Sequence, residues 1–230
     1  MAGDQSNRTW TITIIGVLLA LFGFLLLRVW ELATGIAVGR IGTSVFKWVL
    51  VGAVVLIVLR FERESLASIG VVKPDRWDVL TGIALFVFGL LSFLLAAPLV
   101  EALGFDIAPF DGDSNGSVDR TMTALLVGLF VGVTAGITEE MLYRGYGLER
   151  LEALSGSTWV AGTVTASLFV VIHFGGHAFG GLLVITPVAV LLTVGYVWRR
   201  NIFVPIIGHV LINSFGGIIS LFTLLLGSLS

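Results

Sequence analysis

The sequence predicts an all-α protein of the polytopic membrane class, a transmembrane helix bundle of about seven spans. Of its 230 residues, 57% are hydrophobic and only 12% are charged, which is about half the charge of a soluble domain. The mean hydropathy is +1.04. The long apolar runs are continuous rather than alternating. They therefore favour helices over barrel strands, because in lipid the backbone must satisfy its own hydrogen bonds.

A helix needs about 20 apolar residues to cross the hydrocarbon of a bilayer. Seven runs come near this length: residues 10–27, 42–59, 79–102, 122–143, 159–174, 182–198 and 202–226. The first has no small-residue cleavage site behind it, so we interpret it as a retained anchor rather than a signal peptide. The fifth run is short and glycines follow it. An eighth crossing, or a re-entrant segment, therefore stays open near residues 175–185.

Basic residues between the spans predict the orientation, because cytoplasmic loops carry an excess of lysine and arginine. Nine of them fall on one side: Arg8, Arg60, Arg63, Lys73, Arg76, Arg144, Arg150, Arg199 and Arg200. The other side has Arg28, Arg40 and Arg120, and Lys47 lies within a span. The N-terminus is therefore expected in the cytoplasm and the C-terminus outside. No repeat or composition change divides the chain, so residues 1–230 are expected to form one membrane domain.

The composition also excludes several classes of function. The chain has no cysteine, which excludes disulfides, thiolate metal sites and a cysteine nucleophile. The net charge is −2 and no basic cluster indicates nucleic acid. The partner that the sequence predicts directly is the lipid bilayer.

Polar and charged side chains inside apolar spans cost about 2–3 kcal/mol or more each, so they mark functional sites. Here they form three groups, each on its own span: Glu139 and Glu140 with Arg144, Phe169 with His173, and His209 with Asn213. In each group two side chains are four residues apart, which places them on one helix face. Three helices thus present polar pairs to a common interior.

Glu140 is expected to pair with Arg144 one turn further on. Glu139 has no cation near it in the sequence, so we expect it to face the interior unpaired. A carboxylate beside a histidine suits general-base activation of water. A single intramembrane histidine is more often a packing residue, but two of the three histidines lie inside spans, each with a partner four residues away. The combination favours a site.

The three motifs, Glu-Glu-x-x-x-Arg, Phe-x-x-x-His and His-x-x-x-Asn in this order, resemble those of the CPBP family. That family comprises the type II CAAX prenyl endopeptidases and the Abi proteins. The resemblance covers roughly residues 66–215 as a catalytic core. It implies hydrolysis of a peptide bond near the C-terminus of a membrane-tethered or prenylated substrate.

Carried onto this chain, the resemblance implies that Glu139 with His173 activates a water and that His209 with Asn213 stabilises the oxyanion. Glu140 belongs to the same catalytic set. The remaining motif residues, Arg144 and Phe169, are expected to support the site or bind substrate.

The resemblance implies no cofactor in its metal-free form. The alternative is a zinc protease in which Glu139, His173 and His209 hold the metal. Histidines on separate helices do not form the spacing of an H-E-x-x-H site, and Asn213 suits an oxyanion hole better than a zinc ligand. Two other classes stay open: a proton-coupled transporter, since intramembrane Glu and His also build proton relays, and a non-catalytic scaffold or immunity protein on the same fold.

Counting residues along the spans places the three groups at different depths. For them to meet, the fourth helix must continue beyond Arg144 towards Leu151, or the fifth must begin below the surface. Gly145 and Gly147 weaken the first possibility because glycine disfavours helix.

Two further features are weaker. Asp111, Asp113 and Asn115 imitate a calcium loop, but Met122 occupies the twelfth position where a bidentate glutamate is needed, so we interpret the segment as a solvated acidic loop. His177, in a glycine-rich stretch, is expected to be a loop residue.

Overall fold

The computed structural model describes residues 2–107, 121–174 and 178–227, and in this part of the chain all regular structure is helical. The elements follow in this order: α1 (Ala2–Phe22), α2 (Leu25–Thr34), α3 (Arg40–Leu56), the π-helix η1 (Ile57–Glu62), the 3₁₀-helix η2 (Leu66–Ile69), α4 (Arg76–Ala102), α5 (Met122–Glu140), the π-helix η3 (Met141–Leu148), α6 (Glu149–Ser155), α7 (Thr158–Val171), α8 (Phe179–Arg199) and α9 (Phe203–Gly227). The predicted all-α class is confirmed.

Polar side chains define where several of these helices begin. Asp75 and Asp78 form a capping box at the start of α4, each accepting from the other's backbone N–H. Thr121 caps α5 and Ser157 caps α7 through side-chain oxygens that accept from the backbone N–H three residues on. Such caps satisfy the amides that a helix N-terminus leaves without partners.

Within the described residues, five helices are long and apolar enough to cross a membrane: Arg40–Glu62, Arg76–Ala102, Met122–Ser155, Phe179–Arg199 and Phe203–Phe222. Their length and composition make the chain a multi-pass integral membrane protein. The other two predicted spans differ from expectation. The first is broken between Phe22 and Leu25 by a bend of 65°, so it is one span only if the bent pair is counted together. The apolar helix of the fifth, α7, has 14 residues, or about 21 Å, which is shorter than the hydrocarbon layer.

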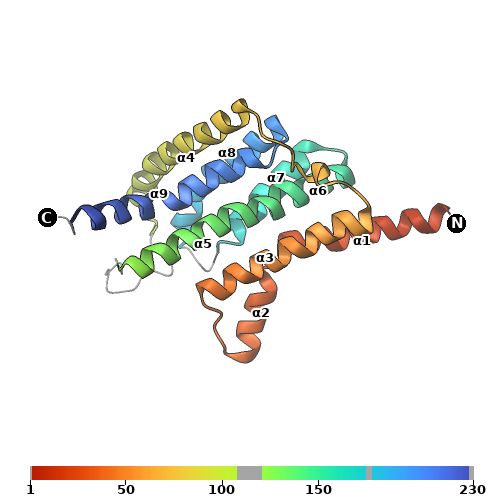
Figure 1. Ribbon diagram of the computed structural model, residues 1–230, viewed down its shortest axis with the longest axis horizontal. Helices are drawn as coiled ribbons and strands as arrows, with labels where there is room; N and C mark the ends of the chain where they lie inside the picture. Colours follow the sequence, from red (N-terminus) through yellow and green to blue (C-terminus); the bar gives the residue numbers. More distant parts are fainter. Residues whose placement is uncertain (1, 108–120, 175–177, 228–230) are drawn as a thin grey trace.

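The long helix α5 runs through the middle of the molecule (Figure 1). On one side it packs against α9, which in turn packs against α4 and α8; on the other side it packs against α3. Helix α7 lies against α8 and η3, and α1 lies against η3. The short helix α2 projects away from the bundle (Figure 1) and buries none of its residues.

Helices α5, η3 and α6 are continuous, which bears on the different depths predicted for the three motif groups. They form one helical segment, Met122–Ser155, of 34 residues. The fourth helix therefore continues past Arg144 to Leu151, which is the first of the two arrangements that would let the three motifs meet. Ala178 is the N-cap of α8 and residues 179–185 form its first turns, whereas residues 175–177 are outside the described residues.

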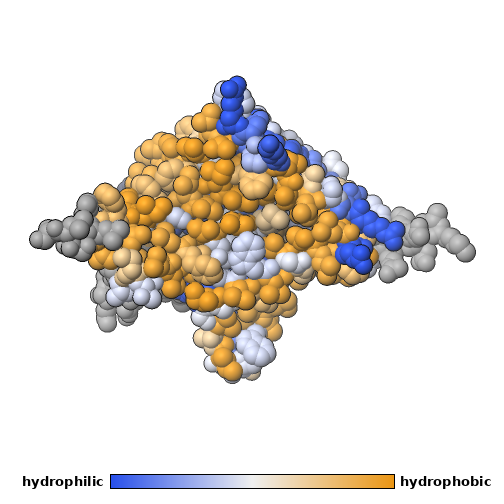
Figure 2. Space-filling model, in the orientation of Figure 1, coloured by the Kyte–Doolittle hydropathy of each residue, from blue (hydrophilic) through white to orange (hydrophobic). Residues whose placement is uncertain are grey.

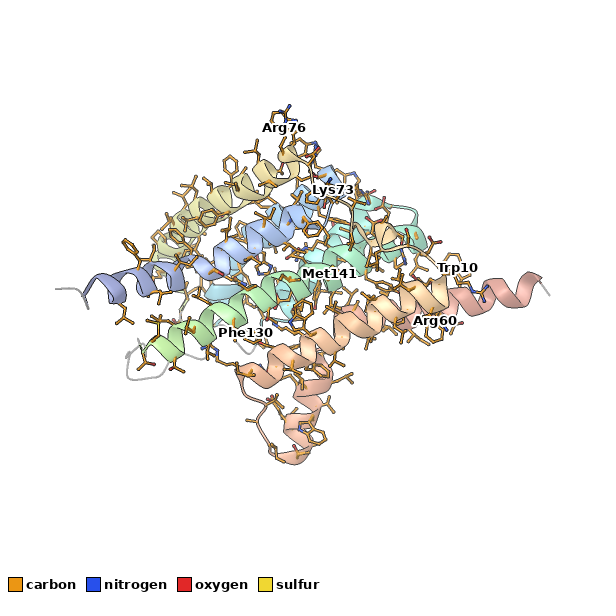
Figure 3. All side chains as sticks on the ribbon, in the orientation of Figure 1. Trp10, Arg60, Lys73, Arg76, Phe130 and Met141 are labelled. Carbon is orange, nitrogen blue, oxygen red and sulfur yellow. The ribbon has the colours of Figure 1, made fainter. Side chains whose placement is uncertain are left out.

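The surface is apolar over most of the face shown in Figure 2, and the hydrophilic residues form one edge. Figure 3 places Lys73 and Arg76 at that edge and Arg60 in η1, which continues α3. Phe130 on α5 and Met141 at the start of η3 lie in the apolar body. An apolar belt with a hydrophilic edge is the surface that a bilayer selects.

Candidate active site

Two consecutive glutamates lie at the end of α5, where the helix passes into the π-helical turns of η3. Both are buried, with 7% of Glu139 and none of Glu140 exposed. Consecutive residues of a helix point about 100° apart, so the two carboxylates have different neighbours.

Glu140 is held by an arginine and a histidine. Its Oε1 accepts a hydrogen bond from Arg144 Nη1 at 3.0 Å and lies 2.7 Å from His209 Nδ1. Arg144, also fully buried, donates to the hydroxyl of Thr193 and to the backbone carbonyl of Ala189 on α8. The predicted Glu140–Arg144 pair is confirmed, and it connects α5, α8 and α9.

Glu139 has a different cation. Its Oε1 accepts a hydrogen bond from Lys47 Nζ on α3 at 2.5 Å, and the two side chains are 9% and 17% exposed. The expectation that Glu139 is unpaired is therefore wrong, because its partner lies 92 positions away in the chain. Lys47 is therefore a candidate site residue that the sequence prediction does not include. Its signal was present, since it is the one charged residue in the apolar run 42–59.

His173 follows the last turn of α7, and its ring is oriented by that turn. Its Nδ1 lies 2.7 Å from the carbonyl oxygen of Phe169, which can only accept, so Nδ1 carries the hydrogen. In the neutral ring Nε2 is then the acceptor nitrogen. The spacing of four residues between Phe169 and His173 thus fixes a tautomer that can take a proton from water.

The Phe169 ring lies at the centre of the polar groups and is 4% exposed. It contacts the rings of Tyr143, His173 and His209 at centroid distances of 5.4, 4.9 and 5.8 Å. The Arg144 guanidinium lies 4.3 Å from its centroid, a cation–π contact. This geometry favours the supporting role that was one of the two expected for Phe169.

His209 and Asn213 come from α9. An ionised carboxylate can only accept, so Nδ1 of His209 would donate a hydrogen bond to an ionised Glu140. The other ring nitrogen, Nε2, does not take part in this contact. The Asn213 amide donates to the carbonyl oxygen of Gly132 on α5 at 3.4 Å. One amide hydrogen is thus engaged, and the other is available for a second acceptor.

A cavity of about 730 Å³ borders this group of side chains. Glu139, Tyr143 and His173 line it from α5, η3 and the end of α7, and Lys47 lines it from α3. Much of the remaining wall comes from α1, α2 and the start of α3. His209 and Asn213 are not part of the lining. The carboxylate of Glu139 and the imidazole of His173 therefore share one chamber, with His209 behind them.

The zinc alternative needs its ligands grouped around one point. In residues 2–107, 121–174 and 178–227, no three histidine, aspartate or glutamate side chains are grouped so that they could hold a metal ion. The metal-free reaction, with zinc held by Glu139, His173 and His209 as the alternative, stays a prediction.

Residues 121–215 match the family model described as type II CAAX prenyl endopeptidase Rce1-like. This segment is similar to that family, and we refer to it as the Rce1-like domain. It contains all seven motif residues, from Glu139 to Asn213, whereas Lys47 lies outside it. No curated protein and no solved structure showed significant similarity to the chain. The Rce1-like family supports an intramembrane protease of the CAAX type at the level of the family.

The limits of the Rce1-like domain clarify the architecture of the site. The domain supplies α5 to most of α9 and therefore both glutamates and both histidines. The N-terminal helices α1–α3 supply the lysine and a wall of the cavity. Two predictions concern residues that the structure does not describe. They are the acidic loop with Asp111, Asp113 and Asn115, and the loop position of His177.

Proposed function

We propose that the chain is an intramembrane endopeptidase that cleaves a peptide bond near the C-terminus of a membrane-tethered substrate. The observation that carries this proposal is the shared cavity lined by Glu139, His173 and Lys47. Intramembrane carboxylates and imidazoles are retained only where they act, because each is costly in lipid. Their position in an Rce1-like domain indicates which reaction they serve.

The proposed reaction needs no group beyond water and the side chains. A water in the cavity loses a proton to Glu139 or to Nε2 of His173 while its oxygen attacks the scissile carbonyl carbon. The tetrahedral intermediate then collapses, the C–N bond breaks, and the proton passes to the leaving nitrogen. The products are a carboxylic acid and an amine, which after proton transfer are a carboxylate and an ammonium group, so atoms and charge balance.

We assign stabilisation of the oxyanion to His209 and Asn213 because the family resemblance implies this role; neither residue lines the cavity. Protonated His209, held at Nδ1 by Glu140, would donate from Nε2, and Asn213 would donate its second amide hydrogen. Such donors act best when they are fixed before the reaction. The bond between Glu140 and His209 supplies this fixation, so Glu140 acts by positioning, whereas Glu139 acts on the water.

The test uses the purified protein and a panel of prenylated and transmembrane-tethered peptides, with products identified by mass spectrometry. We expect cleavage of at least one tethered peptide, retained after exhaustive chelation and lost in Glu139→Gln. Glu64→Gln, which changes an exposed glutamate outside the cavity, is the matched control.

Failure to cleave any tethered peptide would contradict the proposed endopeptidase activity. Loss of cleavage on chelation, with recovery on adding zinc, would contradict the metal-free mechanism and leave the protease. Equal rates for Glu139→Gln and Glu64→Gln would take Glu139 out of the reaction.

A further inference from the structure

The two ends of the bundle differ in charge. Seven basic residues of the described loops and helix ends lie at the edge where α3 ends, α4 begins and α8 meets α9: Arg60, Arg63, Lys73, Arg76, Arg150, Arg199 and Arg200. Arg28 and Arg40 line the cavity instead. Figure 2 shows this edge as hydrophilic, and Figure 3 labels Arg60, Lys73 and Arg76 near it. We refer to it as the basic end. By the positive-inside rule it faces the cytoplasm.

Ion pairs hold the helices in register at the basic end. Arg150 Nη2 binds Glu62 Oε2 at 2.8 Å, which places the ends of η1 and η3 at one level. Glu62 ends the helix Arg40–Glu62, which has 23 residues. At 1.5 Å per residue, Arg40 lies about 33 Å from Glu62 along the helix axis. This distance is close to the hydrocarbon thickness of about 30 Å. Arg40 is therefore at the opposite end of the bundle.

The cavity extends from the middle of the bundle towards Arg40. Its inner part is lined by Glu139, His173 and Lys47, and Lys47 lies about 10 Å along α3 from Arg40. Its outer part is lined by exposed residues at the turn from α2 to α3, among them Gly39 and Arg40. None of the basic-end residues lines it. The chamber thus opens at the end remote from the basic end.

We infer that the site receives its substrate from the non-cytoplasmic side of the membrane, as a membrane-anchored peptide whose cleavable segment lies outside the cytoplasm. This inference rests on the proposed function. It names the substrate class by location, because a soluble segment in the cytoplasm would have to cross the basic end and the packed helices to reach Glu139.

The polar mouth of the cavity agrees with a peptide segment. Arg28 and Glu31 form an ion pair there, and Arg40 is an exposed cation. An extended peptide carries backbone amides and carbonyls that need polar partners once they leave water. A chamber for the apolar anchor alone would not need charged residues at its entrance.

The first experiment maps the two ends in sealed cells. Because the chain has no cysteine, single substitutions report accessibility to a membrane-impermeant maleimide directly. Gly39→Cys probes the mouth, where an added Cβ meets no atom within 4 Å, and Lys73→Cys probes the basic end. We expect Gly39→Cys to react in sealed cells and Lys73→Cys to react only after permeabilisation. The reverse pattern, or a Gly39→Cys that reacts in neither condition, would overturn the inference.

The second experiment places one cleavable sequence on either side of the membrane. Two reporters carry the same sequence and the same transmembrane anchor, inserted in opposite orientations, with the wild-type protein and Glu139→Gln expressed beside them. Cleavage of the outward reporter alone, lost in Glu139→Gln, is expected. Cleavage of the inward reporter alone would overturn the inference while the proposed function stands. Absence of cleavage of both reporters, together with failure on the purified peptide panel, would reject the function itself.

Discussion

Glu139 and Glu140 are adjacent in the chain, yet different residues compensate their charges. Glu140 is bound to Arg144 and His209 and is fully buried, while Glu139 is bound to Lys47 and borders the cavity. A carboxylate without a cation in such surroundings is costly. Each glutamate thus has a separate cationic partner, so Glu140 contacts His209 while Glu139 borders the cavity.

Lys47→Met tests this assignment at the level of a single side chain. We expect the cleavage rate to fall roughly 30- to 150-fold, the equivalent of about 2–3 kcal/mol for an uncompensated intramembrane charge. Lys47→Arg keeps the charge and should retain most of the activity. The measurement is kcat for a tethered peptide, with Lys73→Met at the exposed basic end as control. A wild-type rate in Lys47→Met would show that the ion pair has no part in catalysis.

The motif residues were predictable from the sequence, but their contacts were not. Charged residues in apolar runs identify Glu139, Glu140 and His209, and the i, i+4 rule identifies the Glu140–Arg144 and Phe169–His173 pairs. The partners of Glu139 and of the His209 ring come from other helices, 92 and 69 positions away. Spacing within one helix carries no information on pairs between helices. The sequence therefore identifies Lys47 only as a charge within a span.

At the level of the elements, glycines decide how closely the helices approach. Gly145 and Gly147, which weaken the prediction that the fourth helix continues, lie inside the π-helical turns of η3. A Cβ at Gly147 would be 2.8 Å from Leu21 of α1, and one at Gly145 would be 3.1 Å from the Ile69 carbonyl oxygen. These residues therefore allow close packing, which compensates for their low helix propensity.

Gly136→Ala on α5 is expected to disturb the site without touching it. A Cβ there would lie 2.8 Å from the backbone nitrogen of Val210, so α9 would have to shift and carry His209 away from Glu140. Gly128→Ala on the same helix is the matched control, because its Cβ would meet no atom within 4 Å. We expect a lower thermal midpoint and lower activity for Gly136→Ala.

For Gly128→Ala we expect an unchanged or slightly raised midpoint, since alanine favours helix over glycine by up to about 1 kcal/mol. The midpoint can be followed by fluorescence of the six tryptophans. Identical behaviour of the two variants would mean that the α5–α9 contact does not control the site.

The element boundaries show which parts of the fold the sequence contains. Apolar runs identify five long spans because burial in lipid needs little more than composition and length. The shortness of the fifth run was predicted, but the break at Phe22–Leu25 was not, because hydropathy does not distinguish a straight apolar helix from a bent pair.

At the scale of the whole molecule, Glu62 joins the N-terminal helices to the Rce1-like domain. Its carboxylate accepts hydrogen bonds from Thr13 of α1, from Tyr146 of η3 and from Arg150 of α6. The cavity wall formed by α1–α3 is thus fixed to the domain through one buried side chain. The position of Lys47 beside Glu139 depends on the same attachment.

Glu62→Ala should loosen this attachment. We expect it to lower stability by about 3 kcal/mol, the usual cost of breaking a buried ion pair, and to reduce cleavage. Glu64→Ala, two positions on and exposed, should change neither. Thermal unfolding and cleavage of the same purified samples check both effects. Full activity in a destabilised Glu62→Ala would show that the N-terminal helices do not shape the site.

The central claim is that Glu139 and His173 act together on one water in one cavity, and a double-mutant cycle tests it most directly. The measurement is kcat/KM for a tethered peptide with wild type, Glu139→Gln, His173→Gln and the double variant. Residues that act as a unit are strongly non-additive, so the double variant should be about as slow as either single one. Additive losses, or a single variant with the wild-type rate, would contradict the claim.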